Sequence, residues 1–261
     1  MIDYSFSLYD LEYFLLVLTR VSCFVFVAPF FSMKNTPRHV RIGLSFFTAL
    51  LLYETLTPEE TAVTYNTVAG YAAIVVKEAV TGLLIGFAAN MCTNIVSMAG
   101  SIVDMETGLA MAQLMDPTTN QQNSISGVLY QYVFTLMLIA SGMYRFLMGA
   151  LADTFELIPI NGAIFRSDAL IQSMIQFMGE YVIIGFRIAL PVFCVMLILN
   201  AVLGVLAKVS PQLNMFAVGI QMKIAVGLAV LLISATMLPD AANFIFKEMK
   251  EMMSAFVGGM M

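Results

Sequence analysis

The sequence predicts an all-α protein whose long hydrophobic helices are arranged as hairpins in a polytopic membrane protein. Hydrophobic residues make up 60% of the 261 residues, charged residues make up 11%, and the mean hydropathy is +0.89. Soluble domains carry about 25% charged residues, so this chain has less than half of their usual charge. Apolar runs recur along the chain, and several reach the roughly 20 residues that one bilayer crossing requires.

Two hydrophobic runs and a basic turn open the chain. The first run, Leu11–Met33, is long enough to cross a bilayer and carries Arg20 near its middle. The second run, Ile42–Leu56, is of marginal length, since a crossing takes about 20 residues. Between them lies the most basic segment of the chain, with Pro37 surrounded by Lys34, Arg38, His39 and Arg41. The positive-inside rule would place this segment on the cytoplasmic side.

The third apolar region extends from Thr67 to Met115 without a clear stop. As a single helix it would be about 70 Å long at 1.5 Å per residue, which is roughly twice the bilayer core. The region must therefore break, lean or leave the membrane. Gly100 and Gly108 are the expected flexible points, because glycine adopts backbone conformations that other residues avoid.

Small and polar residues recur at steps of three or four within this region. They are Gly82, Gly86, Asn90, Asn94, Ser97, Ser101, Asp104 and Gly108. At the period of a helix they form one stripe. Small residues let a second backbone approach closely, and polar ones can bond across helices at about 1 kcal/mol each. The stripe predicts a face that meets protein, although the Gly82–Gly86 spacing alone could be a chance match.

Three further apolar runs and an amphipathic tail complete the chain: Val128–Ala152, Ala169–Ala207, Leu213–Leu238 and Ala241–Met261. Pro159 and Gly162 mark a loop after the first of these runs. Pro191 should kink the second, because proline cannot donate the helical hydrogen bond. The last two runs should form a hairpin over a short turn.

Eight charged residues lie in or beside the apolar runs: Arg20, Lys77, Glu78, Asp104, Arg145, Glu180, Arg187 and Lys223. A charge in the middle of a membrane costs about 2.5–3.5 kcal/mol on insertion scales, so these side chains should not face lipid. We expect buried charges at helix interfaces, and three interpretations remain open. The charges could form ion pairs between helices of one assembly, line a polar conduit, or act as an ion relay in a transporter.

The chemistry of an enzyme is missing from the sequence. His39 is the only histidine, and no metal-spaced Cys/His cluster, nucleophile motif or phosphate-binding loop occurs. Asp104 and Glu106 are two residues apart, so a helix would point them about 200° away from each other. No basic patch suggests nucleic acid. We therefore expect no enzymatic activity, no cofactor and no metal site.

The stretch Gly100–Ser124 carries the most specific pattern in the chain. Its first part reads GSIVDMETGLAMAQLMDP, and amides and hydroxyls follow. This pattern resembles the signature region of the FliR family of flagellar export-gate proteins, much of which injectisome type III secretion relatives share. Other landmarks occur in the order of that family: Gly82–Gly86, Asp153–Pro159, Ala189–Pro191 and Pro211–Phe216. One departure is Gly142–Arg145, where many members carry histidine after the glycine.

The resemblance implies a structural subunit of a protein export gate in the bacterial inner membrane, at the flagellar basal body. Residues 1–166 would be FliP-like helical hairpins, and residues 167–261 would be a FliQ-like hairpin with an amphipathic tail. A single copy would assemble with FliP-like and FliQ-like subunits and an FlhB-like protein around a channel for unfolded export substrates. The alternative is a multi-pass secondary transporter that uses its buried charges as an ion relay.

The resemblance also implies that the segment matching residues 106–122 projects into the pore as a plug. The residues assigned to it are Glu106, Gly108, Leu109, Met111, Leu114, Met115, Asp116 and Pro117. Methionine and leucine can seal a pore by soft apolar contact and dewetting. Gly108 and Pro117 would bound a loop that is able to move.

Overall fold

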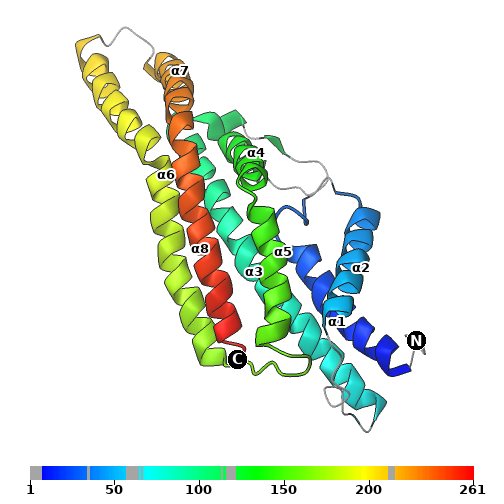
Figure 1. Cartoon of the computed structure of the whole chain (residues 1–261). Coiled ribbons are helices and arrows are strands. Elements are labelled where there is room, and N and C mark those ends of the chain that lie inside the picture. The colour runs from blue at the N-terminus through cyan, green and yellow to red at the C-terminus, as the bar shows by residue number, and fades with distance from the viewer. Residues whose placement is uncertain are drawn as a thin grey trace. The chain divides into compact units, whose positions relative to one another are not determined.

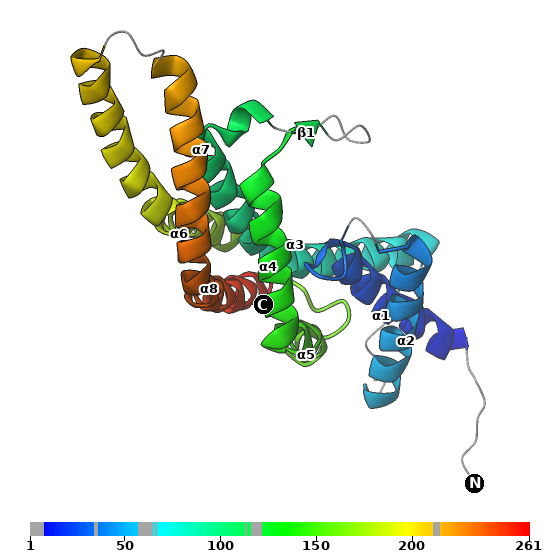
Figure 2. The same cartoon turned by 90° about the horizontal axis from the view of Figure 1, so that it is seen from above.

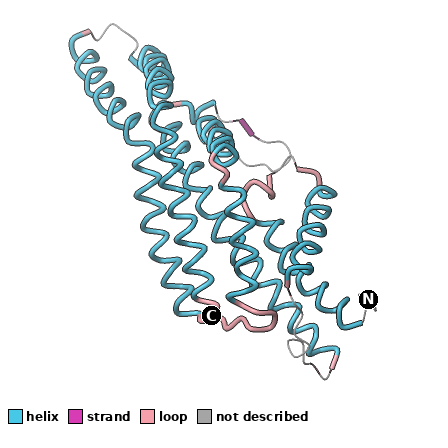
Figure 3. The backbone as a smooth tube through the Cα atoms, in the orientation of Figure 1, coloured by secondary structure: helices cyan, strands magenta, loops and turns pink. Residues whose placement is uncertain are grey.

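The computed structural model describes residues 8–33, 36–56, 65, 67–112, 114–115, 122–210 and 215–261. The all-α prediction is confirmed, because nearly all of the described backbone is helical (Figure 3). The helices in Figure 1 are α1 (Leu8–Val27), α2 (Arg38–Thr55), α3 (Val68–Thr107), α4 (Ile125–Ala140), α5 (Met143–Leu157), α6 (Ser167–Val209), α7 (Met215–Ser234) and α8 (Leu238–Gly258). Two short 3-10 turns, η1 (Leu109–Ala112) and η2 (Ala235–Met237), and two short strands, β1 (Leu114–Met115) and β2 (Gln122–Asn123), complete the elements.

Within the described residues, three helical stretches are long and apolar enough to cross a membrane. They are α3, α6 and the stretch Ala217–Gly258, which joins α7, η2 and α8. A fourth is added if α4 and α5 are counted as one broken span. Although α1 has the expected length, it carries Asp10, Glu12 and Arg20 and is not in this set. The chain is therefore a polytopic membrane protein with three or four candidate spans.

The long third region forms one unbroken helix up to Thr107. With 40 residues, α3 is about 60 Å long at 1.5 Å per residue. It ends at Thr107 because Gly108 takes a φ of +80°, in the left-handed region that favours glycine. The expectation that Gly100 is a flexible point is wrong, since Gly100 lies inside the helix and is fully packed. Gly100 instead lets the backbone of α4 approach α3 closely.

The apolar run Val128–Ala152 was expected to be continuous, but it is divided between two helices. The chain leaves α4 at Ser141 and starts α5 at Met143, and Gly142 between them has a φ of +72°. The loop that Pro159 and Gly162 marked lies between the end of α5 at Leu157 and the start of α6 at Ser167.

The chain divides into two compact units, each made of separate segments. The first comprises Met1–Met91, Gly142–Phe177 and Glu248–Met261, and the second comprises Cys92–Ser141 and Met178–Lys247. These units describe packing, whereas the division at residue 166 describes resemblance to two partner families. The FliP-like and FliQ-like parts therefore stay a prediction.

In the first unit, α1 packs closely on the N-terminal half of α3. A methyl group on Gly82 would overlap the carbonyl oxygen of Arg20, and one on Gly86 would lie 3.0 Å from that of Phe24. Further along, Asn90 Nδ2 donates to the carbonyl of Val27 over 2.9 Å. The prediction that this stripe meets protein is confirmed for these three residues. Farther along the stripe, Asn94 and Ser97 are exposed.

The prediction of an amphipathic tail is confirmed, because α8 buries an apolar face and exposes a charged one. Its buried apolar residues include Met249, Met252, Met253 and Phe256, while Lys247, Lys250 and Glu251 are exposed. In the second unit, the core is formed by apolar side chains from four helices: Val96, Val103, Tyr130, Phe134, Val192, Met196, Ala242 and Ile245.

Candidate functional site

A buried carboxylate holds together the two ends of the predicted plug segment. Asp104 lies in the last turn of α3, is fully buried, and accepts hydrogen bonds from Ser124 Oγ over 2.7 Å and from the Ser126 amide over 3.2 Å. Ser124 caps α4, because its Oγ accepts from the Gly127 amide over 2.9 Å. A carboxylate at a helix N-terminus is stabilised by the helix dipole and the free amides. We call Asp104, Ser124 and Ser126 the stem of the segment.

Glycines let the backbones around the stem approach closely. A methyl group on Gly100 of α3 would overlap the Gly127 backbone of α4. One on Gly227 of α7 would overlap the side chain of Thr107, the last residue of α3. Three helices therefore meet at the stem because no Cβ keeps them apart. The stem is a packed and hydrogen-bonded support rather than a flexible joint.

The segment between the two ends leaves α3 and returns to the same carboxylate. After the left-handed turn at Gly108, η1 follows, and β1 and β2 then pair antiparallel, with Leu114 opposite Asn123 and Met115 opposite Gln122. Glu106 and Leu109 are half-buried. Asp116 and Pro117 lie outside the described residues, as do the side chains of Met111, Leu114 and Met115. The apolar seal therefore stays a prediction.

Replacing Ser124 with alanine is expected to lower the free energy of unfolding by about 1–2 kcal/mol, the usual cost of a lost N-cap. The change removes the cap of α4 and also one of the hydrogen bonds to buried Asp104. Thermal unfolding in detergent, followed by circular dichroism, measures the effect. Ser254→Ala is the control, because this exposed hydroxyl bonds only within its own helix in the described structure. Equal stability of the two variants would contradict a supporting role for the stem.

The second buried charge cluster lies in the first unit. Arg20 of α1 and Glu78 of α3 are both fully buried, and Arg20 Nε lies 2.5 Å from Glu78 Oε2. Arg20 Nη1 also donates to the carbonyls of Thr154 and Ile158, over 3.1 and 2.9 Å. The guanidinium stacks 4.4 Å above the centroid of the Phe155 ring. Arg20 therefore ties α1 and α3 to the C-terminal end of α5.

The cluster continues into the loop after α5. The Asn161 amide donates to Glu78 Oε1 over 2.9 Å, and Lys77 Nζ donates to the Asn161 carbonyl over 2.6 Å. These contacts place Asn161 at a positive φ of +65°, which asparagine tolerates better than most residues. Of the three interpretations of the charges, the Arg20–Glu78 pair matches an ion pair between helices, because its complete burial leaves neither group in a water-filled conduit.

The other five of the eight predicted charges are more accessible than Arg20, Glu78 and Asp104. Lys77, Glu180 and Lys223 are half-buried, and Arg145 and Arg187 are exposed. The guanidinium of Arg145 lies 5.6 Å from the Tyr144 ring, and that of Arg187 lies 4.7 Å from the Phe244 ring. Burial of these five residues at interfaces of an assembly stays a prediction.

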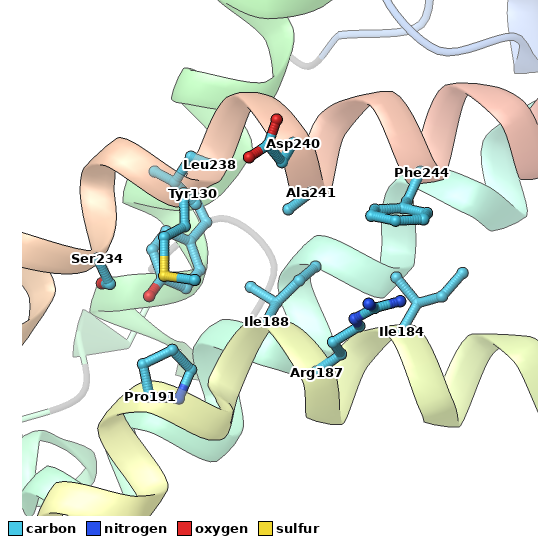
Figure 4. A pocket seen from close by; sticks show the side chains of 11 residues that line it. Tyr130, Ile184, Arg187, Ile188, Pro191, Ser234, Leu238, Asp240, Ala241 and Phe244 are labelled. Carbon is cyan, nitrogen blue, oxygen red and sulfur yellow. The ribbon is translucent and has the colours of Figure 1, made fainter.

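Arg187 lines a cavity of about 240 Å³ in the second unit (Figure 4). Its walls are mostly apolar and come from α4, α6, the end of α7, η2 and α8, with Tyr130, Ser234 and Asp240 as the other polar groups. Figure 4 also shows α6 changing direction at Pro191, as expected for a proline inside a helix. In the part of the chain that the structure describes, no group of three His, Cys, Asp or Glu side chains could hold a metal ion.

Sequence reasoning found Asp104 but missed its partners. Ser124 stands directly before an apolar helix, which is the pattern of an N-cap residue, so its capping role could have been predicted. Its bond to Asp104 could not, because the two residues are 20 positions apart. Phe155 and Asn161 were missed for the same reason, since each meets a charge far away in the sequence.

Comparisons with known proteins match most of the length of this chain. Residues 11–249 match the family described as "Bacterial export proteins, family 1". A flagellar biosynthetic protein FliR from Bacillus subtilis strain 168 is 30% identical over 226 residues, covering 84% of this chain and 85% of that protein. The FliR proteins of Aquifex aeolicus strain VF5 and Escherichia coli strain K12 are 28% and 24% identical over 241 residues. They cover 91% and 92% of this chain, and 91% and 90% of their own lengths.

The family match includes the stem, the Arg20–Glu78 cluster and the candidate spans α3 and α6 in full, and it covers the stretch Ala217–Gly258 up to residue 249. It displaces the alternative of a small-molecule transporter and agrees with the lack of catalytic motifs in the sequence. The chain belongs to the FliR family of bacterial export proteins, membrane-bound and non-enzymatic components of the flagellar type III export apparatus.

Proposed function

We propose that this chain is a pore-forming subunit of the flagellar export gate and that residues 106–122 close its channel. The observation that carries the proposal is the stem. Asp104 holds the start of α4 through Ser124 and Ser126, so the segment begins and ends at one anchored place. A closure element needs such a support, because the segment can then move without separating the helices that carry it.

The composition of the segment supports the same role. Near its start Gly108 takes the left-handed conformation, and its arms pair through backbone hydrogen bonds. Met111, Leu114 and Met115 offer apolar groups that adapt their shape and exclude water from a narrow pore. Segment residues without fixed charge, including Asn120, Gln121 and Gln122, would let an unfolded chain pass without strong binding.

We further propose that the chain is a single copy in a hetero-oligomer with FliP-like and FliQ-like subunits, next to an FlhB-like protein, in the bacterial inner membrane at the flagellar basal body. Residues 1–166 would take the FliP-like place and residues 167–261 the FliQ-like place. Large apolar side chains along α6 and α7 support extensive contacts with other helices or lipid, since Ile198, Val205, Leu232 and Ile233 are all more than 60% exposed.

Deletion of Leu109–Met115 is expected to leave the gate assembled and to raise its ion conductance well above that of the intact gate. The stem lies outside the deleted residues, so the supporting helices keep their contacts. Co-purification of the tagged chain with its hydrophobic partner subunits reports assembly. Ion flux across vesicles that contain the purified gate reports closure.

A length-matched variant separates the apolar seal from the simple presence of a loop. In this variant a glycine–serine sequence of equal length replaces Leu109–Met115, and we expect a leak like that of the deletion. A tight gate in the replacement variant would contradict sealing by apolar side chains. Unchanged conductance of the deletion would overturn the plug altogether.

A further inference from the structure

The helix α2 is basic at one end, and the gating proposal makes no use of it. Arg38 and His39 are exposed in its first turn, and that turn contains no acidic residue. Val40 is exposed, and the next residue, Arg41, is half-buried. Arg41 donates from Nη2 to the carbonyl of Met33. Because cations are unfavourable at the positive end of a helix dipole, this end favours an external anion.

Only one face of α2 is covered by its neighbour α1, which lies beside it in Figures 1 and 2. Ser45 and Ala49 are buried on the covered face, and the Phe14 ring of α1 packs edge-on against Phe46 and Tyr53, with centroids 5.7 and 6.0 Å apart. The outer face is apolar and open: Val40, Ile42, Phe47, Leu50 and Leu51 are all exposed.

Charge is separated along the α1–α2 pair. Glu54 lies near the end of α2, 16 residues after Arg38, which is about 24 Å along a helix. Asp10 and Glu12 of α1 lie at the same end as Glu54, as the contact of Tyr13 with Tyr53 shows. The pair therefore has one basic end, one acidic end and an apolar outer face.

We propose that α2 lies in the membrane interface and that its basic end binds the headgroups of anionic phospholipids. At 18 residues with charges at both ends, α2 is not among the candidate spans within the described chain. Helices of this kind bury an apolar face at the headgroup–acyl boundary and place basic residues against anionic lipid. The positive-inside rule puts basic segments at the cytoplasmic leaflet, where anionic lipids attract them. The proposal is independent of the gating role.

The chain contains no tryptophan, so Phe47→Trp creates a single fluorescent reporter on the outer face. The full chain with this change is reconstituted in vesicles of phosphatidylglycerol and phosphatidylcholine, with only one of the two lipids brominated in its acyl chains. At equal mole fractions we expect stronger quenching when phosphatidylglycerol is the brominated lipid. Phe165→Trp, in the loop before α6, is the matched reporter outside the candidate spans and should be quenched little by either lipid.

The basic residues are tested in the same reporter background. Arg38→Gln/Arg41→Gln should lower the preference for phosphatidylglycerol about fivefold for each arginine removed, since each contributes about 1 kcal/mol near an anionic surface. Arg38→Gln/His39→Gln should also reduce it while leaving the bond of Arg41 to Met33 intact. Arg166→Gln, which removes an exposed arginine outside the spans, should leave it unchanged.

Three results would overturn the proposal. One is equal quenching by both brominated lipids, and another is an unchanged preference in the arginine and histidine variants. The third is loss of quenching when the chain is assembled with its partner subunits, because the outer face of α2 would then be covered by protein.

Discussion

Replacing Glu78 with leucine is expected to lower the free energy of unfolding by about 3–5 kcal/mol, the typical cost of breaking a buried ion pair on one side. The change leaves the guanidinium of Arg20 fully buried without its carboxylate. Two backbone carbonyls and the Phe155 ring remain as its neighbours, but none of them carries a compensating negative charge. The Asn161 amide also loses its acceptor.

The double variant Arg20→Met/Glu78→Leu is the matched control, because it removes both charges and keeps apolar volume. Replacing a buried ion pair by packed hydrophobic groups is often neutral or stabilising, so the double variant should be much more stable than Glu78→Leu alone. Denaturation followed by circular dichroism in detergent compares the intact protein, the two single variants Glu78→Leu and Arg20→Met, and the double variant. If the double variant is as unstable as the single one, the unpaired charge is not the cause.

Replacing Gly100 with alanine is expected to separate α3 from α4 and to open the gate. The added methyl group would overlap the Gly127 backbone, which has no side chain that could rotate away. Overpacking of this kind costs about 1–3 kcal/mol in a well-packed core. Because Asp104 lies one helical turn further on, the same displacement should weaken its bonds to Ser124 and Ser126.

Gly149→Ala is the control for this substitution, since Gly149 also lies inside a helix but has open space where a Cβ would be. It should stabilise the protein by about 0.5–1 kcal/mol, as alanine is the better helix former. The assay is ion flux through the assembled gate, with stability measured in parallel. A tight gate with Gly100→Ala would show that the contact of α3 and α4 does not support closure.

Much of the architecture could be predicted because it depends on local pattern. Low charge and long apolar runs indicated the membrane helices, and the stripe from Gly82 to Asn90 indicated the face that α1 covers. Gly108 was predicted as a flexible point of the third region, and α3 does end directly before it, at Thr107. Gly100 was misassigned, because a glycine that bends a helix and one that admits a second backbone look the same in a sequence.

The sequence by itself determined the membrane class, the helical periodicity and the presence of charges that must avoid lipid, because these follow from composition and spacing. Only the tertiary structure decided which charges pair. Arg20 meets Glu78 across 58 residues, and Asp104 meets Ser124 across 20. These partners are selected by the close approach of helices at Gly82 and Gly100, a distance set by packing that no local pattern encodes. The segment that the sequence marked as unusual therefore gains a defined support, one buried carboxylate holding both of its ends.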